Sequence, residues 1–242
     1  MGEFRLSGRI AVVTGGGRGL GRELVRALAG EGADVAFSYR ESRRSALEEA
    51  EAVRLLGRRA FTGPADARVP GEIAAFVDEA AAALGGCDFL VNNVGVFRRI
   101  PLEEMSEEVL DEAFDVNVKA AVMASRAAVP HMRRRGGGAI VNVASLGGTR
   151  PWPFHLAYCA SKAALCMATQ CLALALAPQI RVNAVAPGIL EPPGADEAVR
   201  RRVPAGRFGT HGEAVEAILF LLAGGGYTTG EVLKVDGGRS LA

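Results

Sequence analysis

Short apolar runs bounded by turn residues alternate along this chain with longer segments of helical periodicity. The runs, which are typical of buried strands, are Ile10–Val13, Val35–Ser38, Phe89–Val91, Ala139–Val143, Arg181–Ala186 and Val232–Val235. Between them, apolar residues recur on one helical face, as at Leu20, Leu24 and Leu28. Because strands that alternate with helices form parallel sheets, the pattern predicts an α/β fold: a doubly wound parallel sheet with helices on both faces.

The length and composition of the chain favour one domain that acts on small molecules. Its 242 residues, 49% of them hydrophobic, can bury one large core, and no linker divides them, so we predict a single Rossmann-type domain over residues 1–242. The net charge of +1 does not favour binding to nucleic acid or to a membrane surface. The N-terminal segment lacks the apolar core of a secretory signal, and no uncharged apolar stretch reaches about 18 residues. We therefore expect a cytoplasmic protein without a membrane partner.

The potential metal ligands are scattered. Cys87, Cys159, Cys166 and Cys171 have no paired Cys-x-x-Cys spacing, and the three histidines do not cluster with them. We predict that the cysteines act as small buried hydrophobic residues and that the chain has no metal site.

A glycine-rich turn follows the first apolar run directly. Ile10–Val13 leads into Thr14-Gly15-Gly16-Gly17-Arg18-Gly19-Leu20-Gly21 and then into a helical pattern. Glycines let the backbone approach a pyrophosphate, and a helix N-terminus offers it amide donors and positive potential. The turn therefore predicts a dinucleotide site, although a tight connection without a ligand would have the same pattern.

Tyr158 and Lys162 lie four residues apart in a run of helix formers, so their side chains share one helical face. A free tyrosine has a pKa of about 10, and a neighbouring ammonium lowers it by favouring the phenolate. Tyr158 is therefore a candidate general acid or base. The alternative is a surface lysine that lies along a half-buried ring.

Other polar residues follow later strands. Asn92-Asn93-Val94-Gly95 comes after Phe89–Val91, and Ser145 follows Ala139–Val143, thirteen residues before Tyr158. An ordinary turn or a capping serine would also fit these places. Asn117 falls within a predicted helix, where its amide needs a partner if it is buried.

Together these motifs, with the Thr-Gly-x-x-x-Gly-x-Gly spacing of the turn, resemble the short-chain dehydrogenase/reductase family, in the branch of bacterial 3-oxoacyl-[acyl-carrier-protein] reductases. The resemblance spans essentially the entire chain and implies a catalytic tetrad of Asn117, Ser145, Tyr158 and Lys162. Tyr158 would protonate the developing alkoxide as hydride arrives from the nicotinamide, while Ser145 stabilises the charge. Lys162 would lower the phenol pKa and bind the nicotinamide ribose, and Asn117 would distort its helix and hold a water of a proton relay.

The end of the second strand bears on the choice of cofactor. It reads Ser38-Tyr39-Arg40, without the acid that binds a ribose 2′-hydroxyl in most NAD enzymes. Arg40 and Arg18 offer guanidiniums suited to a 2′-phosphate, so we predict NADP(H) over NAD(H), unless both are merely solvated. The resemblance also implies contacts with adenine and nicotinamide. The complete set of predicted cofactor contacts is Gly15, Gly17, Arg18, Gly19, Leu20, Gly21, Tyr39, Arg40, Asp66, Ala67, Asn93, Gly95, Tyr158, Lys162, Pro187, Gly188 and Leu190.

The segment after Pro187-Gly188 departs from the family pattern. The family often continues Pro-Gly-x-Ile-x-Thr, but here Pro192 replaces the threonine that anchors the nicotinamide carboxamide, and it removes a hydroxyl and a backbone donor. We expect a short substrate lid at residues 189–203, with an open pocket or a bulky or carrier-tethered substrate. The predicted pocket residues are Phe97, Trp152, Phe154 and His155, with core packing as the alternative for the two phenylalanines.

Three functions remain open on the sequence. They are NADP(H)-dependent reduction of a 3-oxoacyl thioester or similar ketone, dehydrogenation of a sugar, steroid or other secondary alcohol, and cofactor-binding regulation without turnover, which would not need the tetrad. Arg98, Arg99 and Arg133–Arg135 would attract an acidic carrier protein, or would be solvated surface. The resemblance implies a homo-tetramer, or a dimer.

Overall fold

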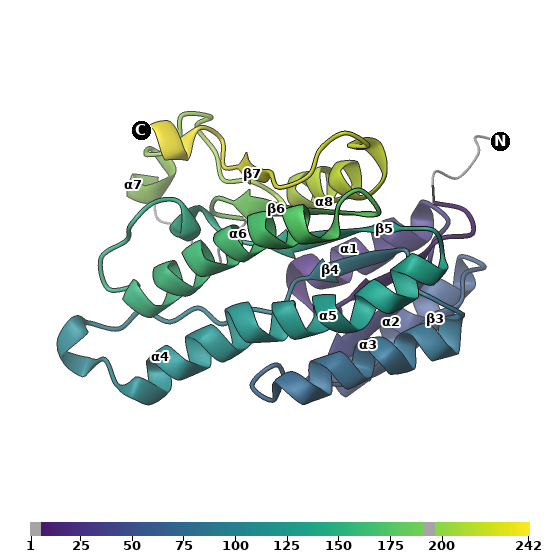
Figure 1. The fold of residues 1–242 in the computed structure, drawn as a ribbon. Coiled ribbons are helices and arrows are strands. Elements are labelled where there is room, and N and C mark those ends of the chain that lie inside the picture. The colour runs from purple at the N-terminus through teal and green to yellow at the C-terminus, as the bar shows by residue number, and fades with distance from the viewer. Residues whose placement is uncertain (1–5, 191–196) are drawn as a thin grey trace.

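The computed structural model of the protein describes residues 6–190 and 197–242, and its centre is a parallel sheet in the order β3-β2-β1-β4-β5-β6-β7 (Figure 1). The strands are β1 (Ile10–Val13), β2 (Asp34–Tyr39), β3 (Ala60–Pro64), β4 (Phe89–Asn92), β5 (Gly138–Val143), β6 (Ile180–Pro187) and β7 (Val232–Val235). Strands from both ends of the sequence thus join one sheet.

Helices cover both faces of this sheet (Figure 1). One face carries α1 (Gly19–Gly30), α2 (Arg43–Leu55) and α8 (His211–Leu219), and the other carries α3 (Pro70–Leu84), α5 (Ala120–Arg134) and α6 (Leu156–Leu176). Alternate residues of β1 serve the two cores, with Ala11 in the first and Val12 in the second. The predicted doubly wound α/β fold is confirmed.

Shorter elements complete the described chain. They are η1 (Leu102–Glu104), α4 (Glu107–Phe114), the π-helix η2 (Asp115–Lys119), η3 (Leu146–Gly148), α7 (Glu197–Arg200), the π-helix η4 (Phe220–Gly224) and η5 (Arg239–Leu241).

The edge strand β3 is absent from the six apolar runs. Its residues Ala60, Phe61 and Thr62 are only half-buried, and Gly63 and Pro64 follow them. An edge strand has one neighbour and needs no continuous apolar run, so its pattern did not stand out.

The chain reverses its direction of winding at β1, which pairs with β2 on one side and with β4 on the other. Ligands of such sheets bind beyond the carboxyl ends of the strands at this switch point. The turn after β1 lies there and is tied to both neighbours: Thr14 N donates to Val91 O at 3.0 Å, and Gly16 N donates to Ser38 O at 2.9 Å.

Among the described residues, only α6 is long and apolar enough to cross a membrane by length and composition. It packs against β6 and η3, and its Lys162 is buried in the protein. Three of its apolar side chains, Leu156, Met167 and Leu174, are nevertheless 50%, 58% and 86% exposed. The helix therefore has an apolar side that this single chain leaves uncovered.

Candidate active site

The first turns of α6 lie against the carboxyl end of β5 and bring Tyr158 and Lys162 to the sheet edge where ligands bind. Lys162 is only 4% exposed, and its Nζ donates to Val143 O, at the end of β5, over 2.8 Å. Ser145 follows the same strand, and its hydroxyl accepts from Gly147 N at 3.1 Å. The hydroxyl of Ser145 also acts on the phenol of Tyr158, whose pKa it lowers, and both residues line the same cavity. These three predicted catalytic residues are therefore gathered in one place.

Asn117 joins this group from η2, where the helix widens into a π-turn. Its amide Oδ1 accepts from Val96 N at 2.9 Å, and its Nδ2 donates to Val96 O at 3.1 Å and to Ser161 Oγ at 2.9 Å. A Cβ on Gly95 would stand 3.1 Å from Asn117 Oδ1 and 3.3 Å from Lys162 Nζ. A side chain at residue 95 would therefore press on Asn117 and Lys162, and both would have to shift by a few tenths of an ångström.

Tyr158 is enclosed by aromatic rings from two other segments. Its centroid lies 4.7 Å from that of Phe97, edge to face, and 6.1 Å from that of Trp152, nearly stacked. Burial among these rings raises the pKa of the phenol, and the Ser145 hydroxyl opposes that shift only in part. The predicted lowering of this pKa by Lys162 is wrong for the structure described, because desolvation dominates and the lysine ammonium is bound at Val143 O instead.

The pKa of Lys162 is itself lowered to about 8, because burial disfavours the charged ammonium, and the nearby thiol of Cys166 opposes this only in part. A buried cation without a carboxylate beside it is costly and is seldom kept for stability. A functional role is therefore the better explanation for a lysine at residue 162.

The glycine-rich turn fits a pyrophosphate. Gly19 opens α1 at φ +52° with open space where a Cβ would stand, and a Cβ on Gly21 would lie 2.1 Å from Gly15 O. Asn93 Nδ2 holds the turn by donating to Thr14 O at 3.1 Å and to Gly15 O at 2.9 Å. The free amides at the start of α1 therefore face an open cradle, as a nicotinamide dinucleotide requires.

A cleft of about 650 Å³ runs from this turn past the ends of β2 and β4. Eleven of the predicted cofactor residues line it, namely Gly15, Gly17, Arg18, Leu20, Gly21, Tyr39, Arg40, Asp66, Ala67, Asn93 and Gly95. Gly19 and Pro187 line neither this cleft nor the cavity described below, and Lys162 lies buried beneath. The structure thus gathers most of the predicted set.

The charges in the cleft are largely paired. Arg40 binds Glu41 at 2.7 Å, Arg98 binds Glu112 at 2.7 Å, and Arg68 binds Asp66 and lowers the pKa of that carboxyl. Arg18 is exposed at the N-terminus of α1. The sequence did not predict Arg68 or Ser38 as residues of the cleft. The Oγ of Ser38 accepts a hydrogen bond from Gly15 N at 3.0 Å. A hydroxyl at the end of the strand beside the turn was the available signal for Ser38.

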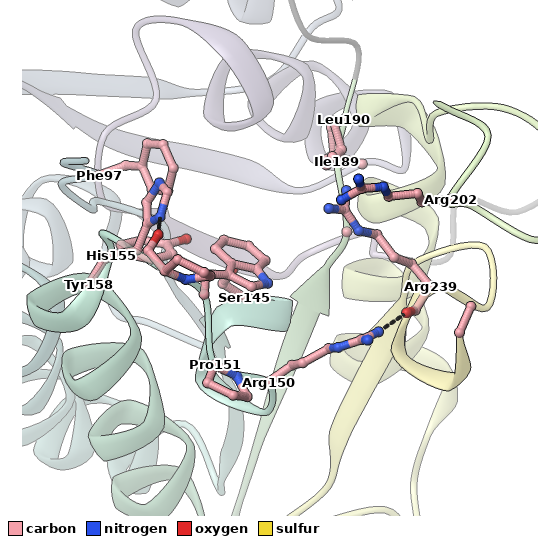
Figure 2. A pocket seen from close by; sticks show the side chains of 14 residues that line it. Phe97, Ser145, Arg150, Pro151, His155, Tyr158, Ile189, Leu190, Arg202 and Arg239 are labelled. Atoms are coloured by element: carbon pink, nitrogen blue, oxygen red, sulfur yellow. Dashed lines mark hydrogen bonds between the residues drawn. The ribbon is translucent and has the colours of Figure 1, made fainter. Parts of the chain in front are cut away.

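A second hollow, of about 910 Å³, opens beside Tyr158 and meets the cleft at Phe97, which lines both (Figure 2). Ser145, Trp152, His155, Gly188 and Leu190 also line it. The predicted place of Phe154 is wrong: its ring lies outside the lining, 4.7 Å beneath the guanidinium of Arg99. Three lining arginines, Arg150, Arg202 and Arg239, were not predicted, because they come from separate segments.

Two further predictions concern the segment after Gly188 and the arginines at residues 133–135. Pro192 and part of the predicted lid, residues 191–196, lie outside the described residues. Gly188 N donates to Val235 O at 2.9 Å, which anchors the start of that segment to β7. Arg135 binds buried Asp88 at 2.9 Å, so this member of the 133–135 group supports the fold.

Comparison with known proteins agrees with the site. A family model described as enoyl-(acyl carrier protein) reductase matches residues 15–240. The 3β-hydroxysteroid dehydrogenase 1 of Eggerthella lenta is 35% identical, over 98% of this chain and 95% of that protein. The 3-oxoacyl-[acyl-carrier-protein] reductase of Thermotoga maritima is 36% identical, over 97% of this chain and 99% of that protein. A short-chain dehydrogenase from Burkholderia cenocepacia, solved in complex with NADP, has a TM-score of 0.92 and 38% identity, covering 97% and 99% of the two chains.

This chain belongs to the short-chain dehydrogenase/reductase family. The match extends over nearly the whole sequence, so the protein is an oxidoreductase of the type that uses a nicotinamide cofactor. In this short-chain dehydrogenase/reductase, Asn117, Ser145, Tyr158 and Lys162 are the residues that correspond to the tetrad inferred from the sequence, and the structure places them together.

The lowered pKa of Lys162 predicts a specific dependence of stability on pH. Between about pH 8 and 10.5 the unfolded chain would bind more protons at this lysine than the folded chain, so its contribution makes the free energy of unfolding rise with pH. We measure the free energy of unfolding of the cofactor-free protein by urea denaturation. The value for wild type minus the value for Lys162→Met should increase by about 2–3 kcal/mol from pH 7 to pH 10. Lys234→Met, at an exposed position, is the matched control. A difference that stays constant with pH would show that Lys162 keeps an ordinary pKa.

Proposed function

We propose that the protein is an NADP(H)-dependent carbonyl reductase in which Tyr158 is the general acid. One observation carries this proposal: Tyr158 and Ser145 both line a cavity that meets the dinucleotide cleft at Phe97. A carbonyl in that cavity would have two hydroxyl donors beside it. When bound, the reduced nicotinamide supplies the hydride.

The chain's own residues supply the proton and stabilise the charge. The raised pKa of Tyr158 keeps the phenol protonated at neutral pH, as reduction requires of a proton donor. Ser145 can donate its hydroxyl to the same oxygen and stabilise the negative charge that develops there. Lys162 would hold the nicotinamide ribose, and Asn117 fixes the loop after β4 through both its bonds to Val96.

The proposed substrate is a 3-oxoacyl thioester or a similar ketone. The cavity of about 910 Å³, with its Phe97, Trp152 and Leu190 lining, has room for an extended acyl group. The dehydrogenase alternative draws support from the relative named as a 3β-hydroxysteroid dehydrogenase, which is as similar as the acyl-carrier-protein reductase. Family membership favours both over a regulator without turnover.

NADP(H) is the proposed cofactor. Arg18 and Arg40 line the cleft beside the end of β2, and Ser42 also faces it, where a ribose phosphate would find donors. The acid that directly follows Arg40 is Glu41, and its carboxylate is paired with the Arg40 guanidinium. The similar Burkholderia structure was solved with NADP, which supports the same choice.

The proposal extends to assembly and location. A homo-tetramer, or a dimer, would cover the exposed Met167 and Leu174 of α6, and a solution mass of one chain would contradict it. An acidic carrier protein as a partner and a cytoplasmic location remain predictions. Arg98 is already paired with Glu112, which weakens its part in recruiting such a carrier.

Activity with a panel of substrates tests the reductase. NADPH oxidation should be observed with an acetoacetyl thioester or with simple ketones, and the reverse reaction should be slower with a panel of sugar and steroid alcohols. The measurement is the absorbance of NADPH in both directions. Binding of NADPH without turnover of any carbonyl would favour the regulator, and turnover confined to steroid or sugar alcohols would favour the dehydrogenase.

Substitution of the two arginines tests the cofactor choice. In the double variant Arg18→Gln, Arg40→Gln, we expect the KM for NADPH to rise about tenfold or more, because two charge-assisted contacts to the phosphate are lost, and the KM for NADH to change little. Arg44→Gln is the control, since Arg44 is 94% exposed and pairs with Glu48 away from the cleft. Equal changes for both cofactors would show that these arginines do not read the phosphate.

A further inference from the structure

One side of the cavity carries positive charge that the tetrad does not use. Figure 2 shows Arg150, Arg202 and Arg239 across the cavity from Phe97, His155 and Tyr158. Arg150 lies just after η3, Arg202 just after α7, and Arg239 at the start of η5. Three guanidiniums from distant parts of the sequence thus meet around one hollow.

Among the described residues these three guanidiniums form no ion pair, although Asp236 acts on Arg239 and Ala242, the last residue of the chain, also lines the cavity. No acidic side chain appears among the residues that line the cavity in the described part of the chain. Arg150 Nη1 donates to a backbone oxygen, Arg239 O, at 2.5 Å, and Arg239 Nη1 is buried with no hydrogen-bond partner. Burial and the neighbouring Arg150 and Arg202 lower the pKa of Arg239, whereas Asp236 opposes the shift. Three like charges therefore repel one another across a partly desolvated space.

A buried donor without a partner and a cluster of like charges are both costly, unless a ligand supplies an acceptor and negative charge. A carboxylate or phosphate oxygen would accept from Arg239 Nη1 and would neutralise the neighbouring guanidiniums, whose planar donor geometry suits such groups. A neutral ligand could supply the acceptor but not the charge. The chemistry of the cluster therefore selects an anion.

We propose that Arg150, Arg202 and Arg239 form an anion subsite, so that the preferred substrate is a carbonyl compound with a carboxylate or phosphate remote from its carbonyl group. This inference rests on the proposed reductase function and adds the substrate class to it. The anionic end would lie at the arginines while the carbonyl lies at Tyr158 and Ser145, and the two anchors would orient the substrate across the cavity.

Matched pairs of substrates test the subsite. Methyl ketones with a terminal carboxylate at increasing spacing, such as 4-oxopentanoate, 5-oxohexanoate and 7-oxooctanoate, are each compared with their methyl esters, and a keto phosphate with its alcohol distinguishes phosphate from carboxylate. At low salt we expect kcat/KM of at least one anionic ketone to exceed that of its neutral partner by about tenfold or more. The preference should fall as the ionic strength rises.

Variants assign that preference to the arginines. Arg239→Gln and Arg202→Gln should lower kcat/KM for the anionic ketone about 10- to 100-fold, chiefly through KM, and change the neutral ester less than about twofold. Arg239→Lys should restore part of the loss. Arg201→Gln is the control, because Arg201 neighbours Arg202 but is 78% exposed, lies outside the lining and approaches Glu197 at 3.6 Å. An acid-to-ester ratio that is the same in wild type and both glutamine variants would overturn the proposal.

A binding measurement separates failure of the subsite from failure of the reductase. Trp152 is the only tryptophan and lines the cavity, so its fluorescence can report occupancy without turnover. Titration of the NADP⁺-loaded protein with the same keto acids should saturate in wild type and weaken in Arg239→Gln, even if no carbonyl is reduced. Equal binding of acid and ester by wild type would refute the anion subsite, whatever the reductase activity.

Discussion

The hydrogen bond from buried Lys162 to the Val143 carbonyl joins the sheet to α6, the helix that carries Tyr158, and the geometry of the candidate site depends on it. This bond fixes the start of α6 at the carboxyl end of β5, next to Ser145. Gly95 packs closely beside this ammonium and beside Asn117, because a Cβ at residue 95 would stand 3.3 Å from Lys162 Nζ and 3.1 Å from Asn117 Oδ1. Burying this ammonium without a carboxylate destabilises the fold, so folding alone does not explain why a lysine stands at residue 162.

The sequence predicted those parts of the molecule that depend on local pattern. Buried strands appear as apolar runs, the turn at residues 14–21 follows from its glycines, and Tyr158 with Lys162 follows from helical spacing. The edge strand β3 was missed because half-buried strands need no such run. The raised pKa of Tyr158 was missed because the extent of its burial, against Phe97 and Trp152, depends on the fold and outweighs the helical spacing to Lys162. Arg239 and Arg202 meet only in the folded chain, so no spacing predicts them.

The two hollows differ in how their charges are balanced, and this difference is consistent with the proposed division between a cofactor cleft and a substrate cavity. In the cleft along β2 and β4, Asp66, Glu41 and Glu112 each pair with an arginine, so the cleft is nearly neutral apart from Arg18. In the cavity beside Tyr158, the described lining holds cations and aromatic rings without an acidic side chain. Phe97 lines both hollows and packs edge to face against Tyr158.

The central claim is that the Tyr158 phenol delivers the proton to a carbonyl in this cavity, and Tyr158→Phe tests it most directly. With the best ketone of the panel, the account predicts that steady-state NADPH oxidation falls about 10²- to 10⁴-fold, while NADPH affinity, measured by fluorescence titration, stays within about twofold. Tyr227→Phe, at a fully exposed tyrosine, should leave both unchanged. Turnover by Tyr158→Phe at the wild-type rate, with the cofactor still bound, would contradict the account.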